Sequence, residues 1–237
     1  MKLSELKIKI FSDGADLDSI VAARDQGIAK GFTTNPTLMS RAGITNYLMF
    51  AREVLRLVPD LPVSFEVFSD DFDGMRRQAS ILRDLGENVY VKIPIMNTRR
   101  ESAVPLIRDL SASGVNLNIT AIMTLRQVQA VAEVLHPSSS AFVSVFAGRI
   151  ADSGRDPLPV MRDSLKALNG LPRAELLWAS PREIYNIVQA DEMGCHIITV
   201  TPALLSKAAS LGKDLDDFSW ETVKMFYDDA VNSGFHL

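Results

Sequence analysis

The sequence has few of the residues that build disulfide frameworks, metal clusters or membrane spans. Cys195 is the only cysteine among 237 residues, which excludes an intramolecular disulfide and is compatible with a reducing compartment. The histidines, His136, His196 and His236, lack the spacing of metal ligands, so we expect no metal site and no cofactor. No apolar run approaches about 18 residues, and the first eleven residues contain none of signal-peptide length. We therefore expect a cytoplasmic protein that does not cross a membrane.

Basic residues are also too few for a typical nucleic-acid-binding protein. Lys and Arg number 25 against 29 Asp and Glu, which gives a net charge of −4, and no basic cluster stands out. Hydrophobic residues make up 47% of the chain, enough to form a large core and to exclude intrinsic disorder. Because the composition shows no break along residues 1–237, we expect a single domain that binds no nucleic acid.

One pattern recurs along the whole chain: a short β-branched apolar run, a polar or Gly/Pro interruption, and then an amphipathic helix. Successive strand cores begin 22 to 33 residues apart, which leaves room for one helix in each interval. The eight expected strand cores are residues 7–12, 30–34, 62–68, 88–93, 115–120, 141–146, 174–179 and 196–200.

Eight strand–helix units in series favour an α/β fold with a parallel sheet closed into a (β/α)8 TIM barrel. The rival is an open doubly wound sheet, which usually has a glycine-rich phosphate loop after its first strand. Here that strand ends in Phe11-Ser-Asp-Gly14, without a G-x-G-x-x-G pattern. Residues 219–232 predict an additional C-terminal helix, which we expect to pack on the barrel or on a neighbouring subunit.

Two Pro-containing pairs predict where late helices begin. Thr201-Pro202 and Ser180-Pro181 place a capping residue before a proline at the first helical position. Glu183 follows Ser180 at the spacing of a capping box, so we expect Arg182 to lie in the first turn of that helix.

Alternation along the fourth strand predicts a lysine inside the barrel. Val89, Val91 and Ile93 share the face toward the helices, whereas Tyr90 and Lys92 share the face toward the interior. Active sites of such barrels lie at the mouth formed by the C-terminal strand ends. The ends of several strands bring these polar residues to that mouth: Asp13, Asn35, Glu66, Lys92, Asn118, Thr120 and Ser144.

Most of these residues also have a purely structural interpretation. Lys92 would be a buried ion-pair partner of Glu66 or Asp13, since a charge among apolar neighbours is costly unless it is paired. Asp13 would cap the first helix, although Asp16 is better placed to do so. Structural roles for the remaining polar residues are a turn begun by Asn35-Pro36, interior hydrogen bonds from Asn118 and Thr120, and helix capping by Ser180.

A lysine in a low-dielectric site favours the neutral amine, which can attack a carbonyl and form a Schiff base. Two nearby carboxylates are suited to moving protons at the imine carbon and at a leaving hydroxyl. This combination predicts lysine-dependent aldol cleavage or addition without a metal. Arg149 and Arg182, after the sixth and seventh strands, together with Ser180, predict a phosphate site on the same rim.

Seven segments spread over nearly the whole chain resemble the transaldolase family, specifically its small-subunit members. They are FSDGAD (11–16), GFTTNPTL (31–38), SFEVFS (64–69), VYVKIP (89–94), NLNITAI (116–122), VSVFAGRI (143–150) and WASPR (178–182). The resemblance implies a Schiff base on Lys92 and transfer of dihydroxyacetone from fructose 6-phosphate to erythrose 4-phosphate, as in the pentose phosphate pathway. It also implies a homo-oligomer, a pentamer or decamer, in which the terminal helix reaches a neighbour.

The resemblance further implies a role for each site residue. Asp13 would deprotonate the C4 hydroxyl, and Glu66 and Thr120 would hold the water that relays protons. The implied substrate-binding residues are Asn35 and Asn118 for the donor hydroxyls and carbanion, Ser144 for the dihydroxyacetone part, and Arg149, Ser180 and Arg182 for the phosphate. Phe146 is also among the expected substrate-binding residues.

Other functions are compatible with the same residues. A sister subfamily, the fructose-6-phosphate aldolases, releases free dihydroxyacetone, but it typically has glutamine at position 66 and tyrosine at position 146, where this chain has Glu66 and Phe146. The departures Gly14 and Pro181 from the family pattern leave open a modified ketose, such as a sulfonated sugar, as the substrate. The non-enzymatic alternative is a silent barrel that binds a sugar phosphate or a partner protein.

Overall fold

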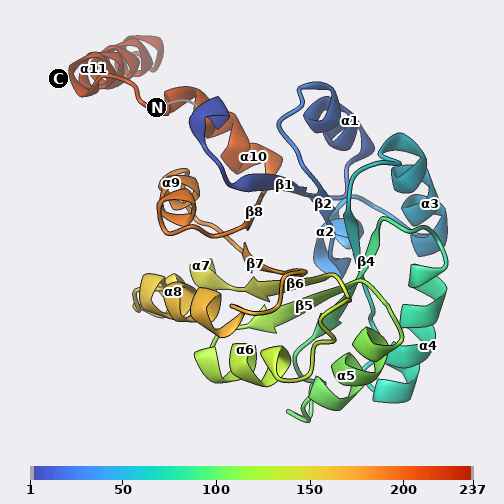
Figure 1. The fold of residues 1–237 in the computed structure, drawn as a ribbon. Coiled ribbons are helices and arrows are strands. Elements are labelled where there is room, and N and C mark those ends of the chain that lie inside the picture. Colours follow the sequence, from blue (N-terminus) through green and yellow to red (C-terminus); the bar gives the residue numbers. More distant parts are fainter. Residues whose placement is uncertain (1–2, 236–237) are drawn as a thin grey trace.

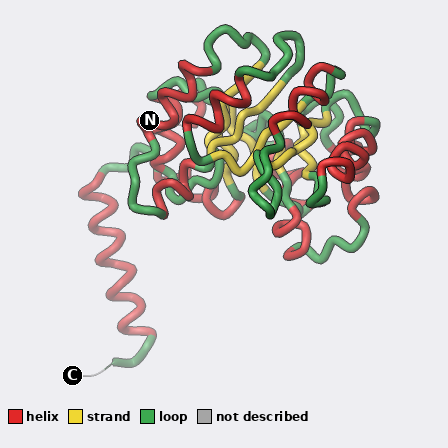
Figure 2. The backbone as a smooth tube through the Cα atoms, turned by 90° about the horizontal axis from the view of Figure 1, so that it is seen from below, coloured by secondary structure: helices red, strands yellow, loops and turns green. Residues whose placement is uncertain are grey.

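Eight parallel strands close into a barrel that the helices surround (Figures 1 and 2). The computed structural model describes residues 3–235. β8 pairs with β1 with Ile197 opposite Lys9, so the sheet has no free edge, and the predicted (β/α)8 barrel is confirmed. The strands are β1 (Lys9–Asp13), β2 (Phe32–Thr33), β3 (Val63–Glu66), β4 (Val89–Pro94), β5 (Leu117–Ile122), β6 (Ala141–Val145), β7 (Ala174–Trp178) and β8 (Ile197–Val200).

The helices connect successive strands and cover the outer face of the barrel (Figure 1). The α-helices are α1 (Leu17–Asp25), α2 (Pro36–Arg41), α3 (Tyr47–Leu57), α4 (Phe72–Arg83), α5 (Val104–Ala112), α6 (Leu125–Ala132), α7 (Ala147–Asp152), α8 (Leu158–Ala167), α9 (Tyr185–Glu192), α10 (Pro202–Leu205) and α11 (Leu215–Asn232). Two short 3₁₀ segments, η1 (Leu3–Glu5) and η2 (Ser206–Ser210), complete the described elements.

Short polar side chains begin most of the helices in the first half of the barrel. Asp16 accepts a hydrogen bond from the Ser19 backbone N–H and caps α1, and Asn35 caps α2 in the same way. Thr201 caps α10 with Pro202 in the first turn, which confirms the start predicted for that helix.

The helix start predicted at Ser180 is wrong. Ser180 has φ +62°, in the left-handed region, whereas a capping residue needs extended backbone. Asn186 Oδ1 accepts from the backbone N–H groups of Arg182 and Glu183, both of which precede the helix. α9 begins only at Tyr185, after Ile184 and without a side-chain cap, and Arg182 lies in the loop between β7 and α9.

The hydrophobic core has two parts, one outside and one inside the barrel. Val89, Val91 and Ile93 belong to the large outer cluster between strands and helices, as their alternation predicts. The smaller inner cluster consists of Phe11, Phe142, Leu177, Ala179 and Ile197, with Tyr90 and Phe146 packed against it.

The inner cluster forms a hydrophobic floor across the barrel. Tyr90 stacks on Phe142 with ring centres 3.9 Å apart, and Phe11 meets Phe142 edge-on at 5.4 Å. Burying the Phe11 and Phe142 rings stabilises the fold by roughly 1.5–3 kcal/mol each. Because Phe11 and Tyr90 lie two residues before Asp13 and Lys92 on β1 and β4, the floor lies directly beneath those polar side chains.

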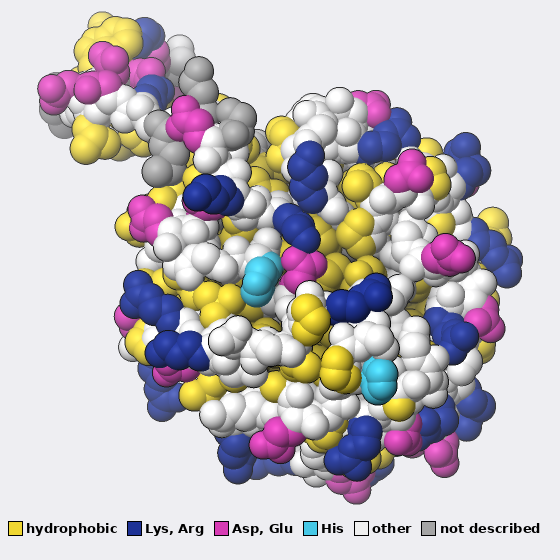
Figure 3. Space-filling model, in the orientation of Figure 1, with side chains coloured by type: hydrophobic (Ala, Val, Ile, Leu, Met, Phe, Trp, Pro, Cys, Tyr) yellow, Lys and Arg dark blue, Asp and Glu magenta, His cyan; other side chains and the backbone are white. Residues whose placement is uncertain are grey.

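α11 projects away from the barrel (Figures 1 and 2), and none of its residues is buried. It begins at Leu215, four residues before the predicted start. Hydrophobic side chains gather on this projecting helix (Figure 3). Its exposed large hydrophobic residues are Leu215, Phe218, Trp220, Val223, Met225, Phe226, Tyr227 and Val231. Within the described part of the chain, no helix has both the length and the apolar character needed to cross a membrane.

Candidate active site

A cavity of about 690 Å³ opens at the C-terminal ends of the strands. The structure brings all eleven predicted site residues to it, although they come from seven different strands or the segments that follow them. These residues are Asp13, Asn35, Glu66, Lys92, Asn118, Thr120, Ser144, Phe146, Arg149, Ser180 and Arg182.

Lys92 lies at the bottom of this cavity with only 7% of its surface exposed. Its Nζ donates a hydrogen bond to the Thr34 carbonyl at 3.1 Å and lies 3.3 Å from Glu66 Oε2. Glu66 is the register partner of Lys92 on the neighbouring strand, which brings the two side chains together. Since an ammonium has three N–H donors, these two contacts leave one for a bound molecule.

Asp13 is held by a chain of two threonines beside the lysine. Thr33 Oγ1 donates to Asp13 Oδ1 at 2.7 Å and lies 2.5 Å from Thr199 Oγ1. A hydroxyl has a single proton, so Thr199 must donate to Thr33. Burial raises the pKa of Asp13, while the charge of Lys92 and then the Thr33 hydroxyl oppose the rise. A carboxyl with a raised pKa is suited to taking and returning a proton near neutral pH.

A buried hydrogen-bond network fixes the amide of Asn118. Asn118 Nδ2 donates to Ser64 Oγ at 2.9 Å, and Ser144 Oγ donates to Asn118 Oδ1 at 2.6 Å. The second N–H of the Asn118 amide remains for a ligand oxygen.

Thr120 carries a buried hydroxyl with no hydrogen-bond partner among the described residues. The register of β5 against β6 shifts between Ile119 and Ile122, and Ala121 has φ +60° there. Such a bulge at a barrel rim redirects the adjacent side chains. An unpaired buried hydroxyl costs about 1–3 kcal/mol, so Thr120 is suited to bind a water or substrate oxygen in the cavity.

Charged and polar groups lie along the rim after β6 and β7. The Arg149 guanidinium lies 5.9 Å from the centre of the Phe146 ring, in cation–π geometry. Arg182 forms an ion pair with Asp152, and both arginines line the cavity. On the opposite side, Asn35 uses its side-chain oxygen to cap α2 and so keeps its NH₂ group available.

Sequence reasoning missed three residues that shape this site. Thr199 lies two residues after Ile197 on β8, so strand alternation places it inside the barrel, and Thr33 precedes the predicted Asn35 by two residues. The same alternation was therefore a signal for both threonines. The pairing of Asp152 with Arg182 joins residues 30 apart, at the end of α7 and in the loop after β7, and no local pattern predicts it.

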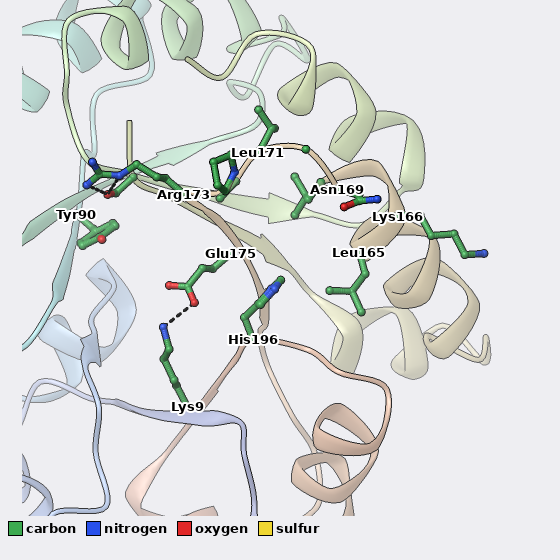
Figure 4. Close-up of a pocket in the computed structure, with 14 residues that line it drawn as sticks. Lys9, Tyr90, Leu165, Lys166, Asn169, Leu171, Arg173, Glu175 and His196 are labelled. Atoms are coloured by element: carbon green, nitrogen blue, oxygen red, sulfur yellow. Dashed lines mark hydrogen bonds and ion pairs between the residues drawn. The ribbon is translucent and has the colours of Figure 1, made fainter. Parts of the chain in front are cut away.

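A larger cavity, of about 1010 Å³, lies at the N-terminal end of the barrel (Figure 4). Lys9 and Glu175 point toward each other there and form an ion pair of 2.6 Å. None of the eleven predicted site residues lines this cavity. We assign the active site to the smaller cavity, because only that one combines a buried lysine with carboxyl groups and because catalytic residues of such barrels lie at the C-terminal end.

Comparison with known proteins gives a family and independently supports the fold. A family model described as "Transaldolase/Fructose-6-phosphate aldolase" matches residues 10–235. A relative from Nitrosopumilus maritimus (strain SCM1), named "Probable transaldolase", is 34% identical and covers 92% of this chain and 96% of its own. A second relative of the same name, from Thermoanaerobacter sp. (strain X514), is 33% identical over 81% of this chain and 85% of its own. The crystal structure of dihydrodipicolinate synthase from Rhodopseudomonas palustris is similar to this chain with a TM-score of 0.57. The match covers 98% of this chain and 82% of that one at 13% sequence identity, so the likeness is one of fold alone.

Replacing Thr33 by valine tests the threonine chain. The substitution Thr33→Val keeps the branched shape but removes the hydroxyl that stabilises the ionised carboxylate, so the pKa of Asp13 should rise further. A ¹³C NMR titration of the aspartate carboxyl groups measures this directly. Thr34→Val is the matched control, because the Thr34 hydroxyl donates to the Ser64 carbonyl and not to Asp13. A pKa of Asp13 that is unchanged or lower in Thr33→Val would contradict this arrangement.

Proposed function

This chain belongs to the transaldolase/fructose-6-phosphate aldolase family, and on that premise we propose that it is a transaldolase acting through a Schiff base on Lys92. It transfers a dihydroxyacetone unit from a ketose phosphate of the fructose 6-phosphate type to an aldose phosphate, as in the pentose phosphate pathway. The single observation that carries the proposal is a buried lysine in contact with Glu66, in one cavity with the second carboxyl group of Asp13.

The first half-reaction breaks the bond between C3 and C4 of the donor. Lys92 passes one proton from its ammonium to the adjacent Glu66 carboxylate, and its free amine adds to the C2 carbonyl. Glu66 returns that proton as water leaves, which gives a protonated imine. Asp13 takes the proton of the C4 hydroxyl, the C3–C4 electron pair moves toward the imine, and glyceraldehyde 3-phosphate leaves. The raised pKa of Asp13 supports this role, because the carboxyl must accept the proton and later return it.

The second half-reaction reverses these steps on another aldehyde. The carbanion at C3 attacks the acceptor carbonyl, Asp13 returns a proton to the new hydroxyl, and water hydrolyses the imine to release Lys92. Glu66 and Thr120 hold that water, a role supported by the unpartnered Thr120 hydroxyl. Asn35, Asn118 and Ser144 bind the donor hydroxyl groups.

The phosphate binds at the rim formed by Arg149, Ser180 and Arg182, which lies across the cavity mouth from Asn35. Glu66 and Phe146 favour transfer over release of free dihydroxyacetone, as the family resemblance implies. Release of dihydroxyacetone without an acceptor is the second candidate function, and replacing Glu66 tests it.

We also propose that the chain assembles with copies of itself through α11. The helix exposes many large hydrophobic side chains and buries none against its own barrel, which is unfavourable in water. Packing α11 on a neighbouring barrel would remove these side chains from water. The number of subunits and the cytoplasmic location stay predictions from the sequence.

Borohydride trapping tests the role of Lys92. Reduction in the presence of fructose 6-phosphate should attach a three-carbon unit to the peptide that contains Lys92, measured by mass spectrometry. Lys92→Met should not be labelled and should lose turnover by about a thousandfold or more, because it removes the nucleophile. Lys166→Met, which changes an exposed lysine on α8, is the matched control. Labelling of Lys92→Met at the wild-type level would refute the proposal, and binding of the sugar without labelling of the wild type would favour a silent barrel.

Replacing Glu66 by glutamine tests the choice between transfer and release. A carboxylate holds water by accepting its protons, whereas an amide NH₂ can donate to the water oxygen and leave a water proton free for the carbanion. Glu66→Gln should therefore raise acceptor-independent dihydroxyacetone release several-fold relative to transfer, measured with and without erythrose 4-phosphate. Glu101→Gln, in the exposed loop after β4, should leave this ratio unchanged. An unaltered ratio in Glu66→Gln would mean that this residue does not set the outcome.

Removing α11 tests the assembly. A chain ending at Gly212 should keep the thermal unfolding midpoint of the isolated barrel, because no α11 residue is buried in it. Its mass by light scattering should fall to that of a smaller assembly or a monomer. A truncated chain with the full-length assembly size would show that α11 is not the interface.

A further inference from the structure

An ion pair between the end of a helix and a loop holds one of the rim arginines. Arg182 Nε donates to Asp152 Oδ1 at 2.8 Å and to Oδ2 at 3.1 Å, and its Nη2 also contacts Oδ2. Asp152 is the last residue of α7, whereas Arg182 lies in the loop between β7 and α9. We propose that Asp152 is a positioning residue that presets the Arg182 guanidinium for the anionic group of the substrate, an inference that rests on the proposed function.

The geometry of the pair leaves part of the guanidinium free. A guanidinium has five N–H donors in one plane, and Asp152 engages the edge formed by Nε and Nη2. Binding two atoms of that edge fixes both the position and the plane of the group. The donors on Nη1 and the outer N–H of Nη2 remain for an oxyanion, and Arg182 lines the cavity. A side chain that is already ordered loses less conformational freedom when the ligand binds.

The backbone around this pair is held just as firmly. A Cβ atom on Gly148 would lie 1.6 Å from the Ser180 carbonyl oxygen, so only glycine permits this approach of α7 to the loop. Gly148 N–H donates to the Ala179 carbonyl at 3.4 Å, and Ser180 adopts φ +62°. Because Arg149 directly follows Gly148, this close approach holds α7, which carries Arg149, against the loop that carries Ser180 and Arg182. The ion pair between Asp152 and Arg182 joins the same two segments through side chains.

Asp152 affects an anion in two opposite ways. Its hydrogen bond from Arg182 lowers the pKa of Asp152, so the carboxylate is charged near neutral pH and repels a bound anion. The hydrogen bonds that Asp152 accepts from Arg182 instead orient the remaining N–H donors of the guanidinium toward the anion. The side chains of Arg182 and Asp152 are 45% and 51% exposed, so water and salt screen the repulsion, whereas orientation is not screened. The orienting effect therefore dominates.

Repulsion by Asp152 and orientation of Arg182 predict opposite changes in anion affinity when the charge of Asp152 is removed. Asp152→Asn should raise the KM for erythrose 4-phosphate by about tenfold, the size expected from lost hydrogen bonds to a charged group, with little change in kcat. The KM for unphosphorylated erythrose should stay the same. Asp152→Glu, which restores a carboxylate, should recover part of the loss. Asp163→Asn, which breaks the exposed Asp163–Lys166 pair on α8, should change neither KM.

Several outcomes would overturn the inference. A KM for erythrose 4-phosphate that falls in Asp152→Asn would show that Asp152 acts only as a repelling charge. A lower thermal midpoint with an unchanged ratio of the two KM values would show that the pair only joins α7 to the loop. Equal losses with phosphorylated and unphosphorylated acceptors would place the effect outside anion binding.

A binding measurement separates this inference from the proposed function. Calorimetric titration with inorganic phosphate should show weaker binding to Asp152→Asn than to the wild type, whether or not either protein turns over a sugar. If the wild type fails to convert fructose 6-phosphate but shows this difference, the proposed reaction is wrong and the role of Asp152 holds. Phosphate affinity that is equal or higher in Asp152→Asn, or undetectable in the wild type, would refute the role of Asp152.

Discussion

The contact between the Lys92 ammonium and the Glu66 carboxylate is the constraint on which the rest of the site depends. Both groups lie on neighbouring strands inside a closed sheet, where water has little access and an unpaired charge is costly. Closure of the barrel is what makes such burial possible, because it satisfies every strand with hydrogen bonds on both sides. The same closure brings Asp13 from the first strand within reach of Lys92, so that the charge of Lys92 acts on the pKa of Asp13.

The lower part of the barrel interior stabilises the fold, whereas the upper part carries the polar groups of the candidate active site. Below, aromatic and aliphatic side chains pack as in any protein core. Above, the same strands carry groups that a stable core would avoid, including a carboxyl with a raised pKa and the unpartnered hydroxyl of Thr120. The large outer cluster between strands and helices offsets this cost, since its residues have no role at the cavity. A division of this kind is expected where functional sites violate the rules that favour stability.

The barrel and the interior position of Lys92 could be predicted because they follow from periodicity. Alternation along β4 assigned Tyr90 and Lys92 to the interior, and eight regularly spaced strand cores indicated the closed sheet. The helix start at Ser180 was wrong because a left-handed residue has no sequence signature when it is not glycine. Its conformation accompanies the close approach of Gly148, a contact between α7 and a loop that is distant from it in the chain. The bulge at Ala121 and the Asp152–Arg182 pair likewise depend on tertiary contacts.

The hydrophobic floor has a kinetic consequence. Phe11, Tyr90 and Phe142 pack across the barrel between its two cavities, and the upper cavity opens at the C-terminal ends of the strands. On the proposed function, an aldehyde released above this floor leaves through the mouth by which the next one arrives. The departing aldehyde would then compete with the acceptor for the same opening.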